Sequence, residues 1–363
     1  MNRLYLDYAA TTPVKPEIVE AMLPYFSDFS LSEVDAIYKD CADTLARCLN
    51  APASTITFTP SGSFSNNLLI KGLANYGKGK GKGTHILTTV IEHPAVGNVF
   101  KHLGDLGFQV EVIPVDHKGY VDLNYLEKCI RPETALVSVM MVNNELGTRQ
   151  PIEAISRLCR LNEVLLHVDA VQALGNIPLD LELLDVDAMT FSAHKVYAPK
   201  GCGAHYIKPA LQHLIEPLIY GEEPCGFNLP YIVGFARAVV MATEQLESRS
   251  THKHLLKEKL RVGLEGLELG IKVNGNPDHP GILNVYIPSR DGDTMVINYD
   301  MYGIAISSGS ACSSGALNAS HVLRAIGYSE AEAKRCIRYA VGDMTTEEEI
   351  DRVIDITRKI LKG

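Results

Sequence analysis

This sequence of 363 residues lacks the patterns that mark membrane, exported and repeat proteins. Its amino terminus has no basic segment followed by a long apolar one, and no uninterrupted apolar run reaches the ~18 residues that a membrane helix needs. Neither an internal repeat nor a low-complexity linker interrupts the chain. We therefore expect a cytoplasmic protein that does not bind membranes.

The eight cysteines lack the paired spacing of metal ligands, and a chain of this length folds without disulfide bonds. We expect no metal site, and we expect most of the thiols to be small buried hydrophobic groups. Cys312 differs, because serine and glycine surround it from Ser307 to Gly315. That composition favours an exposed, mobile loop.

Excess positive charge is also missing, since the formal net charge is −9. This charge argues against nucleic acid as the main ligand. The one basic cluster, Lys78 to Lys82, alternates with glycine and fits a solvated loop. With 46% hydrophobic and 21% charged residues, the chain can bury a large core and is long enough for two domains.

Strand-like and helix-like segments alternate over the first half of the chain. The strand candidates are Thr55 to Thr59, His85 to Val90, Phe108 to Ile113, Ala135 to Met141, Val164 to Val168 and Ala188 to Phe191. The helical stretches are Pro16 to Tyr25, Ser32 to Leu49, Asn67 to Leu73, Ala95 to Leu106, Asn124 to Ile130 and Ile152 to Leu161. This alternation predicts an α/β fold with a mainly parallel sheet and helices on both faces.

The pattern changes from about Leu229, where a long helical stretch begins and continues to Leu267. Shorter strands and helices follow it, and the chain ends in an amphipathic helix from Glu347. We expect a large ligand-binding domain at residues 14–235. Residues 1–13 and 236–363 are expected to form a smaller α+β domain that carries the Cys312 loop.

Polar residues gather where the predicted parallel strands end, and ligands bind at that edge of such sheets. These residues are Glu92 with His93, Asn143 to Glu145, Asp169 with Gln172, and Ser192 with His194 and Lys195. Lys195 follows a strand and precedes Pro199 and Gly201, which end regular structure. A lysine held in this way is either a solvated amine or an imine-forming nucleophile.

A second feature of the same edge suits an anion. The strand that ends at Thr59 is followed by a turn of small residues and then by a helix, so unpaired N–H groups and the helix dipole converge there. Ser61, Gly62, Ser63 and Ser65 therefore suit a phosphate group.

Pyridoxal phosphate requires this combination of groups. A lysine binds the cofactor covalently, a carboxylate keeps the ring nitrogen protonated, and hydroxyl and N–H groups hold the phosphate. Asp169 lies 26 residues before Lys195, about the length of one strand-helix-strand unit.

A series of short motifs runs along nearly the whole chain. They are Tyr5 to Pro13, Ile91 to His93, Val142 to Gly147, His167 to Gln172, Ser192 to Lys195, Pro199 to Gly201, Ser307 to Cys312, and Ile337 with Arg338. With these motifs in this order, the chain resembles the class V aminotransferase group of fold-type I pyridoxal phosphate enzymes. Within the group it is most similar to the cysteine desulfurases of the NifS/IscS kind. The resemblance implies a seven-stranded sheet in the large domain and a homodimer.

The resemblance also implies a role for each matching residue. Lys195 would bind the cofactor covalently and Cys312 would be the mobile nucleophile. Asp169 would pair with the ring nitrogen, Gln172 with the ring 3-oxygen, and His93 would stack on the ring and shuttle protons. The phosphate would be held by Ser192, His194, Gly62 and Ser63, and the substrate carboxylate by Asn144 and Arg338.

The implied reaction converts L-cysteine to L-alanine and leaves a persulfide on Cys312. The sulfur would then pass to an acceptor protein for iron–sulfur cluster assembly or thio-modification. Two alternatives stay open: a selenocysteine lyase or other pyridoxal phosphate-dependent lyase or aminotransferase, and a non-catalytic relative that acts as a binding partner. Retention of both Lys195 and Cys312 argues against the second alternative.

The site residues also have ordinary structural interpretations. Taken singly, Asp169 fits a helix N-cap, His93 a strand-end histidine and Arg338 a surface ion pair. Independent structural needs would not place these residue types in this order along one chain. The set therefore favours the functional interpretation.

Two stretches are shorter than in the family. Phe26 to Ser32 runs directly into the next helix, and Glu222 to Asn228 replaces a glycine-rich stretch. Phe227 stands about where a threonine of the neighbouring subunit would reach the phosphate, and the turn Gly62 to Ser65 is also shortened. Their effect on cofactor binding, substrate choice and dimer geometry is left open.

Overall fold

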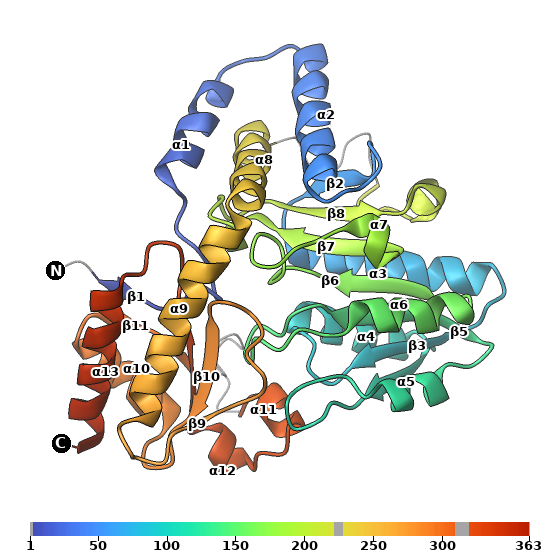
Figure 1. Ribbon diagram of the computed structural model, residues 1–363. Helices are drawn as coiled ribbons and strands as arrows, with labels where there is room; N and C mark the ends of the chain where they lie inside the picture. Colours follow the sequence, from blue (N-terminus) through green and yellow to red (C-terminus); the bar gives the residue numbers. More distant parts are fainter. Residues whose placement is uncertain (1–2, 221–227, 309–318, 363) are drawn as a thin grey trace.

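The computed structural model describes residues 3–220, 228–308 and 319–362. Cys312 and the stretch 222–227 lie outside these ranges, so the structure does not test the predictions made for them. Figure 1 shows a large sheet flanked by helices and, beside it, a smaller group of elements formed by the C-terminal part of the chain.

The large sheet has seven strands in the order β2-β8-β7-β6-β5-β3-β4. They are β2 (Ile56–Thr59), β3 (His85–Thr89), β4 (Gln109–Ile113), β5 (Thr134–Met140), β6 (Leu165–Asp169), β7 (Ala188–Ser192) and β8 (Gly203–Ile207). Strands β3 to β7 are parallel, whereas β8 is antiparallel to β2 and β7. The predicted α/β fold with a mainly parallel, seven-stranded sheet is confirmed, although β8 was not predicted.

Helices cover both faces of this sheet because successive strand residues point to opposite sides. Leu136 of β5 packs in one cluster with residues of α3 (Gly62–Gly79) and α4 (Pro94–Asp105). The next residue, Val137, packs in the opposite cluster, which includes residues of α2 (Leu31–Cys48), α5 (Leu123–Cys129), α6 (Ile152–Leu161), α7 (Leu181–Leu184) and α8 (Leu229–Glu244). The sheet is thus the middle layer of three.

The C-terminal part is built on an antiparallel sheet in the order β12-β13-β10-β9. Its strands are β9 (Lys272–Val273), β10 (Ile282–Tyr286), β12 (Ser307–Ser308) and β13 (Cys336–Ala340). The helices here are α9 (Leu246–Glu265), α10 (Gly292–Met301), α11 (His321–Ala325), α12 (Glu330–Ala333) and α13 (Glu347–Lys362). The N-terminal strand β1 (Leu4–Tyr5) pairs with β11 (Ile304–Ala305), so the start of the chain lies beside this part.

Helix boundaries differ from the sequence prediction at several places. Helix α2 begins at Leu31, one residue before the predicted start at Ser32, and Ser30 is its N-cap, because Ser30 and Glu33 form a reciprocal capping box. The first helix, α1 (Pro16–Met22), ends in a 3-10 turn, η1 (Leu23–Phe26). The long stretch from Leu229 divides at Gln245 into α8 and α9.

The most consequential difference concerns α3. This helix begins at Gly62, earlier than the predicted Asn67, and ends at Gly79. Ser61 is its N-cap, with its side chain accepting the backbone N–H of Phe64 at 3.1 Å. The small-residue turn is therefore the helix N-terminus itself, and part of the basic cluster at Lys78 is helical.

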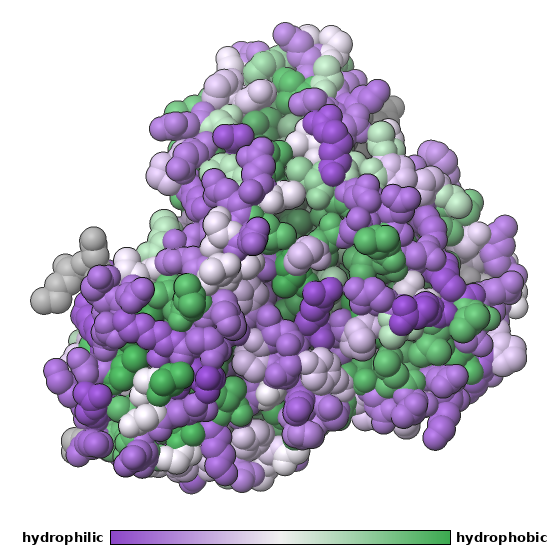
Figure 2. All heavy atoms as spheres, in the orientation of Figure 1, coloured by the Kyte–Doolittle hydropathy of each residue, from purple (hydrophilic) through white to green (hydrophobic). Residues whose placement is uncertain are grey.

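Hydrophobic residues reach the surface in patches among hydrophilic ones (Figure 2). Leu23, Phe26 and Leu31, at the ends of η1 and α2, are 62%, 64% and 84% exposed. Within the described ranges, no helix is both long and apolar enough to cross a membrane.

Candidate active site

A cavity of about 220 Å³ lies at the carboxyl ends of the parallel strands. The residues that line it and were predicted from sequence are Gly62, Ser63, His93, Asn144, Asp169, Gln172, Ser192, His194 and Lys195. Ala9, Ala10, Ser61, Asn66 and Val171 are among the other lining residues. The structure thus brings most of the predicted site together, although these side chains come from segments far apart in the sequence.

Lys195 enters the cavity from the end of β7. It ends the short 3-10 turn η2 (Ala193–Lys195), and its Nζ donates to the carbonyl oxygen of Ala10 at 2.7 Å and to that of Ala9. Gln172 donates to the same carbonyl of Ala9 at 2.8 Å. The N-terminal segment therefore forms one wall of the cavity and holds two of its polar side chains.

Asp169 ends β6 and is 6% exposed. Its Oδ1 accepts the backbone N–H of Val171 at 3.0 Å, which is the local contact that a capping aspartate makes. Its Oδ2 accepts from Nδ2 of Asn66 at 2.8 Å. Both donors are uncharged, so the buried carboxylate is suited to a cationic ligand group.

His93 follows β3 and caps α4. Its Nδ1 accepts the backbone N–H of Ala95 at 3.1 Å, so the neutral ring carries its proton on Nε2. Burial lowers the pKa of His93; the negative charge of Asp169 opposes this shift, and the positive charge of Lys195 adds to it. A neutral ring at the cavity wall fits a stacking role.

The N-terminus of α3 supplies the anion-binding groups. The first N–H groups of a helix have no partner within it, and here they belong to a helix of 18 residues that starts at Gly62. A Cβ at Gly62 would lie 3.0 Å from Cγ2 of Val171 and 3.3 Å from Cβ of Ser192. The glycine keeps this end of the cavity open.

His194 lies beside this end of the cavity. Burial lowers its pKa to about 4, and the nearby charges of Lys195 and Lys200 act in the same direction. Its Nδ1 is 3.1 Å from Oγ1 of Thr11. A neutral imidazole can donate one hydrogen bond to a phosphate oxygen without adding a charge.

Arg338 does not line the cavity but lies next to it. It belongs to β13 and is buried, and its Nη1 donates to the backbone oxygen of Asn144 at 2.9 Å. Its Nη2 pairs with Oδ1 of Asp7 at 2.8 Å, so the arginine forms a buried ion pair instead of a surface one. Within the described part of the chain, its Nε–H has no hydrogen-bond partner.

Two buried carboxyl groups accompany the site without lining the cavity. Glu92 accepts the hydroxyl of Thr89 at 2.6 Å and the backbone N–H of Met140 at 2.8 Å, both at Oε1. Glu145 accepts the hydroxyl of Ser320 at 2.6 Å. Burial raises the pKa of both groups, to about 8 for Glu92.

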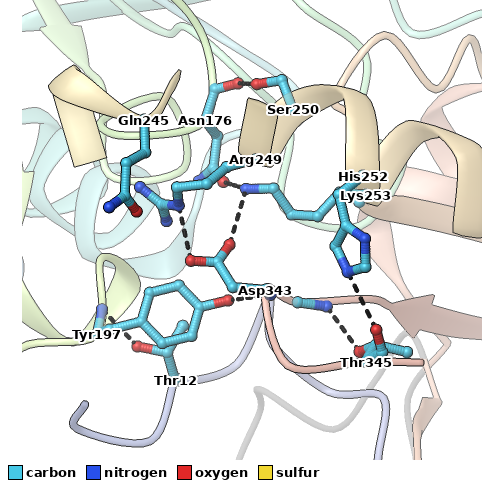
Figure 3. Close-up of polar contacts among 12 residues, drawn as sticks. Thr12, Asn176, Tyr197, Gln245, Arg249, Ser250, His252, Lys253, Asp343 and Thr345 are labelled. Atoms are coloured by element: carbon cyan, nitrogen blue, oxygen red, sulfur yellow. Dashed lines mark hydrogen bonds and ion pairs between the residues drawn. The ribbon is translucent and has the colours of Figure 1, made fainter. Parts of the chain in front are cut away.

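The loop after Lys195 is tied to the C-terminal part through Tyr197 (Figure 3). The hydroxyl of Tyr197 accepts the backbone N–H of Asp343 at 2.6 Å, and its own N–H donates to Thr12 at 2.7 Å. The Asp343 carboxylate in turn pairs with Arg249 at 2.6 Å and Lys15 at 2.7 Å. This network links the loop after Lys195 to three distant segments of the chain.

The donor set fits pyridoxal phosphate. Lys195 supplies an amine, Asp169 a buried carboxylate with uncharged partners, and the N-terminus of α3 unpaired backbone N–H groups for an anion. These groups lie around one cavity. By contrast, no group of three potential metal ligands occurs within residues 3–220, 228–308 and 319–362.

Asn66 is a polar lining residue that the sequence patterns did not predict. It lies one helical turn after Gly62, a spacing that puts both on the same side of α3. The predicted start at Asn67 hid this relationship, because it placed Asn66 outside the helix.

Comparisons with known proteins agree with this geometry. Residues 4–353 match the family model described as Aminotransferase class-V. The chain is 39% identical to a mitochondrial cysteine desulfurase of Arthroderma benhamiae over 98% of this chain and 74% of that protein. It is 38% identical to cysteine desulfurase IscS of Clostridium botulinum over 100% of this chain and 95% of that one. A solved NifS-like protein superposes with a TM-score of 0.91 at 36% identity, covering 99% of both chains.

Proposed function

The chain belongs to the class-V aminotransferase family and is a pyridoxal phosphate-dependent cysteine desulfurase, and we propose which of its residues perform the reaction. The enzyme converts L-cysteine to L-alanine and retains the sulfur for transfer. One observation carries the assignment of residues: Lys195, Asp169 and the N-terminus of α3 meet in one cavity.

The cofactor would be held at three points. Lys195 would bind it covalently, Asp169 would receive the protonated ring nitrogen, and Gly62, Ser63, Ser192 and His194 would hold the phosphate. Gln172 would bond the ring 3-oxygen and His93 would stack on the ring. When bound, the cofactor supplies an electron-accepting ring that makes the α-proton of an amino acid acidic.

Proton transfer is assigned to Lys195 and His93. The Nζ of Lys195 already lies among carbonyl oxygens of Ala9 and Ala10, which can orient the amine toward the cavity. His93 carries its proton on Nε2 because Nδ1 is occupied. These two groups would accept and return protons at the substrate carbon atoms.

The substrate carboxylate is assigned to Asn144 and Arg338. A guanidinium has five N–H donors, and Arg338 uses one on Asp7 and one on the backbone of Asn144. Its Nε–H, without a described partner, would be available for the carboxylate. The arginine is held at the edge of the site by both of these bonds.

Sulfur transfer is assigned to Cys312 on the resemblance of its motif. Its thiolate would attack the substrate sulfur, so that an S–S bond forms while the carbon–sulfur bond breaks. The electron pair of the broken bond stays with the carbon skeleton, which takes up a proton and leaves as alanine. The persulfide then passes its outer sulfur to an acceptor protein, which we propose to serve iron–sulfur cluster assembly or thio-modification.

A cysteine turnover assay tests these assignments. Wild-type protein loaded with pyridoxal phosphate should show a visible absorption band, and with cysteine and a reductant it should release equimolar alanine and sulfide. Lys195→Ala should lose the band, whereas Lys200→Ala, a nearby exposed lysine, should keep it. Protein that takes up no cofactor would contradict the function.

The role of Cys312 needs its own comparison. Cys312→Ser should abolish sulfide release while the cofactor still responds spectrally to cysteine, and Cys48→Ser should leave turnover unchanged. Full turnover in Cys312→Ser would instead indicate a direct lyase. The same assay with selenocysteine separates the desulfurase from a selenocysteine lyase.

We also propose that the enzyme is a homodimer in which a second copy covers the apolar surface formed by Leu23, Phe26 and Leu31. These three exposed hydrophobic residues lie close together in the sequence, and a group of such side chains, unlike a single one, commonly marks an interface. Light scattering should show a dimer in wild type and a shift toward monomer in the double variant Leu23→Asp/Phe26→Asp. Leu161→Asp, which changes an even more exposed leucine elsewhere, should remain dimeric.

Two further proposals concern organisation and location. We propose residues 14–235 as the large domain and 1–13 with 236–363 as the small one, since the two main sheets fall in these separate ranges. Limited proteolysis tests this division.

We also propose a cytoplasmic location. This proposal needs a test because one relative is a mitochondrial protein, and fractionation of the native cell provides it.

A further inference from the structure

Asn66 is a buried amide for which the proposed reaction has no assigned use. It lies on α3 at 1% exposure and lines the same cavity as Asp169 and Lys195. Burying an amide is unfavourable unless its polar atoms are paired. The hydrogen bonds of Asn66 therefore indicate why a buried amide is present here.

The two ends of the Asn66 amide have different surroundings. Its Nδ2 donates to Oδ2 of Asp169 at 2.8 Å. Its Oδ1 has no hydrogen-bond partner within the described ranges. A carboxylate oxygen is an acceptor, so the NH₂ end of the amide must be the one that faces Asp169.

Asp169 is thereby held from two directions. The N–H of Val171 comes from the turn that directly follows β6 and binds Oδ1 at 3.0 Å. The Asn66 donor comes from another element, 103 residues away, and binds Oδ2. One bond leaves a carboxylate free to rotate about its Cβ–Cγ axis, whereas a bond at each oxygen fixes the plane of the group.

We propose that Asn66 is a positioning residue that fixes the Asp169 carboxylate in the orientation in which it receives the protonated ring nitrogen of pyridoxal phosphate. The inference rests on the proposed function of the cavity. It also gives α3 two tasks: its first N–H groups, at Gly62 and Ser63, serve the phosphate, and Asn66, ~6 Å further along the helix axis, serves the carboxylate.

The dissociation constant of pyridoxal phosphate, measured by calorimetric titration of the full-length apoprotein, tests the proposal. Asn66→Ala should weaken binding about tenfold or more, because it removes a hydrogen bond to a buried charged group. The matched control is Asn67→Ala. Asn67 is the next residue of α3 and makes a local bond to the backbone oxygen of Ser63, and its removal should change binding less than about threefold.

A cofactor analogue separates positioning from a general structural effect. In 1-deazapyridoxal phosphate a carbon replaces the ring nitrogen, so Asp169 has no ring N–H to receive. Asn66→Ala should weaken binding of the natural cofactor but not of the analogue. In an Asp169→Ala background, removal of Asn66 should have no further effect on either ligand.

A second variant keeps the test valid if Asn66→Ala does not fold. Asn66→Asp has nearly the same shape but no donor when ionised, so it should weaken cofactor binding at neutral pH. Its deficit relative to wild type should shrink in mild acid, because a protonated carboxyl can donate to Asp169.

The possible results distinguish the two levels of the proposal. Wild-type protein that binds no pyridoxal phosphate would overturn the function itself. Wild-type protein that binds it, together with Asn66 variants that bind equally well or lose both ligands to the same extent, would overturn only the role of Asn66.

Discussion

At the scale of single residues, Glu92 shows how burial alters a carboxyl group beside the site. Its Oε1 accepts two hydrogen bonds, whereas its Oε2 has no partner within the described ranges. Burial raises its pKa from 4.5 to about 8, and the charge of Asp169 adds to the shift. At neutral pH the group is therefore mostly protonated and adds little negative charge next to Asp169.

This protonation predicts a pH-dependent difference between wild type and Glu92→Gln. A carboxyl whose folded-state pKa is raised binds more protons folded than unfolded, so wild type loses stability as pH rises from about 4.5 to about 8. Glutamine resembles the protonated acid and does not titrate. Urea unfolding should show the variant gaining a few kcal/mol on wild type between mild acid and about pH 8.

The matched control for this measurement is Glu127→Gln, which changes an exposed glutamate on α5. Its stability difference from wild type should be nearly constant over the same pH range. A pH-independent difference in Glu92→Gln as well would show that Glu92 is ionised in the folded protein.

At the scale of elements, the close approach of β8 to the start of α3 shapes the phosphate end of the cavity. Gly203 of β8 pairs with Thr59 on one side and with Ser192 on the other. A Cβ at Gly203 would lie 2.6 Å from the carbonyl carbon of Ser61 and 2.7 Å from the nitrogen of Gly62. Both are backbone atoms, which cannot move aside without shifting the helix N-terminus.

Gly203→Ala is therefore expected to destabilise the protein by about 1–3 kcal/mol through overpacking. It should also weaken pyridoxal phosphate binding, because the displaced turn carries the N–H groups assigned to the phosphate. Thermal unfolding and cofactor titration measure the two effects.

Gly97→Ala provides the contrast, because this glycine has open space around it. Gly97 lies inside α4, and a Cβ there would meet nothing within 4 Å. This change should stabilise the protein by about 0.5–1 kcal/mol through helix propensity. Equal effects of the two substitutions would contradict the steric account of Gly203.

At the scale of the whole molecule, a buried charge cluster joins the C-terminal part to the loop behind Lys195. Asp343 pairs with Lys15 of the N-terminal segment and with Arg249 and Lys253 of α9. Figure 3 shows Arg249 and Lys253 beside Asp343. Burial alone would raise the pKa of Asp343, but the three cations outweigh it and lower that pKa. Burial also lowers the pKa of Lys253, to about 8.

Asp343→Asn should destabilise the protein strongly, by about 3–5 kcal/mol, because it leaves buried cations without their counter-charge. The stabilisation by the Asp343 charge is present above its unfolded pKa near 3.8 and is lost as pH falls through the lower folded value. The difference between wild type and variant should therefore shrink in strong acid. Chemical unfolding at neutral and acidic pH measures both effects.

An exposed ion pair serves as the control for Asp343. Asp300→Asn breaks the contact with Arg3. The side chain of Asp300 is 64% exposed and that of Arg3 is 63% exposed. The expected change is below about 1 kcal/mol. A similarly small change in the stability of Asp343→Asn would show that the charge cluster does not hold the C-terminal part against the loop that follows Lys195.

Local sequence patterns determined the α/β class and most of the candidate site. Alternating strand and helix patterns imply a parallel sheet, and the carboxyl ends of its strands meet at one edge. These patterns therefore predict that His93, Asp169 and Lys195 lie around one cavity. Their position depends only on where each strand ends.

Only the tertiary structure decided which groups touch. The bonds from Asn66 to Asp169, from Arg338 to Asp7 and from Arg249 to Asp343 join residues 103, 331 and 94 positions apart. No local periodicity contains this information, because hydrogen-bond partners are set by distances across packed elements. The sequence alone thus determined which chemistry the strand ends can offer, whereas packing decided how each of those side chains is held.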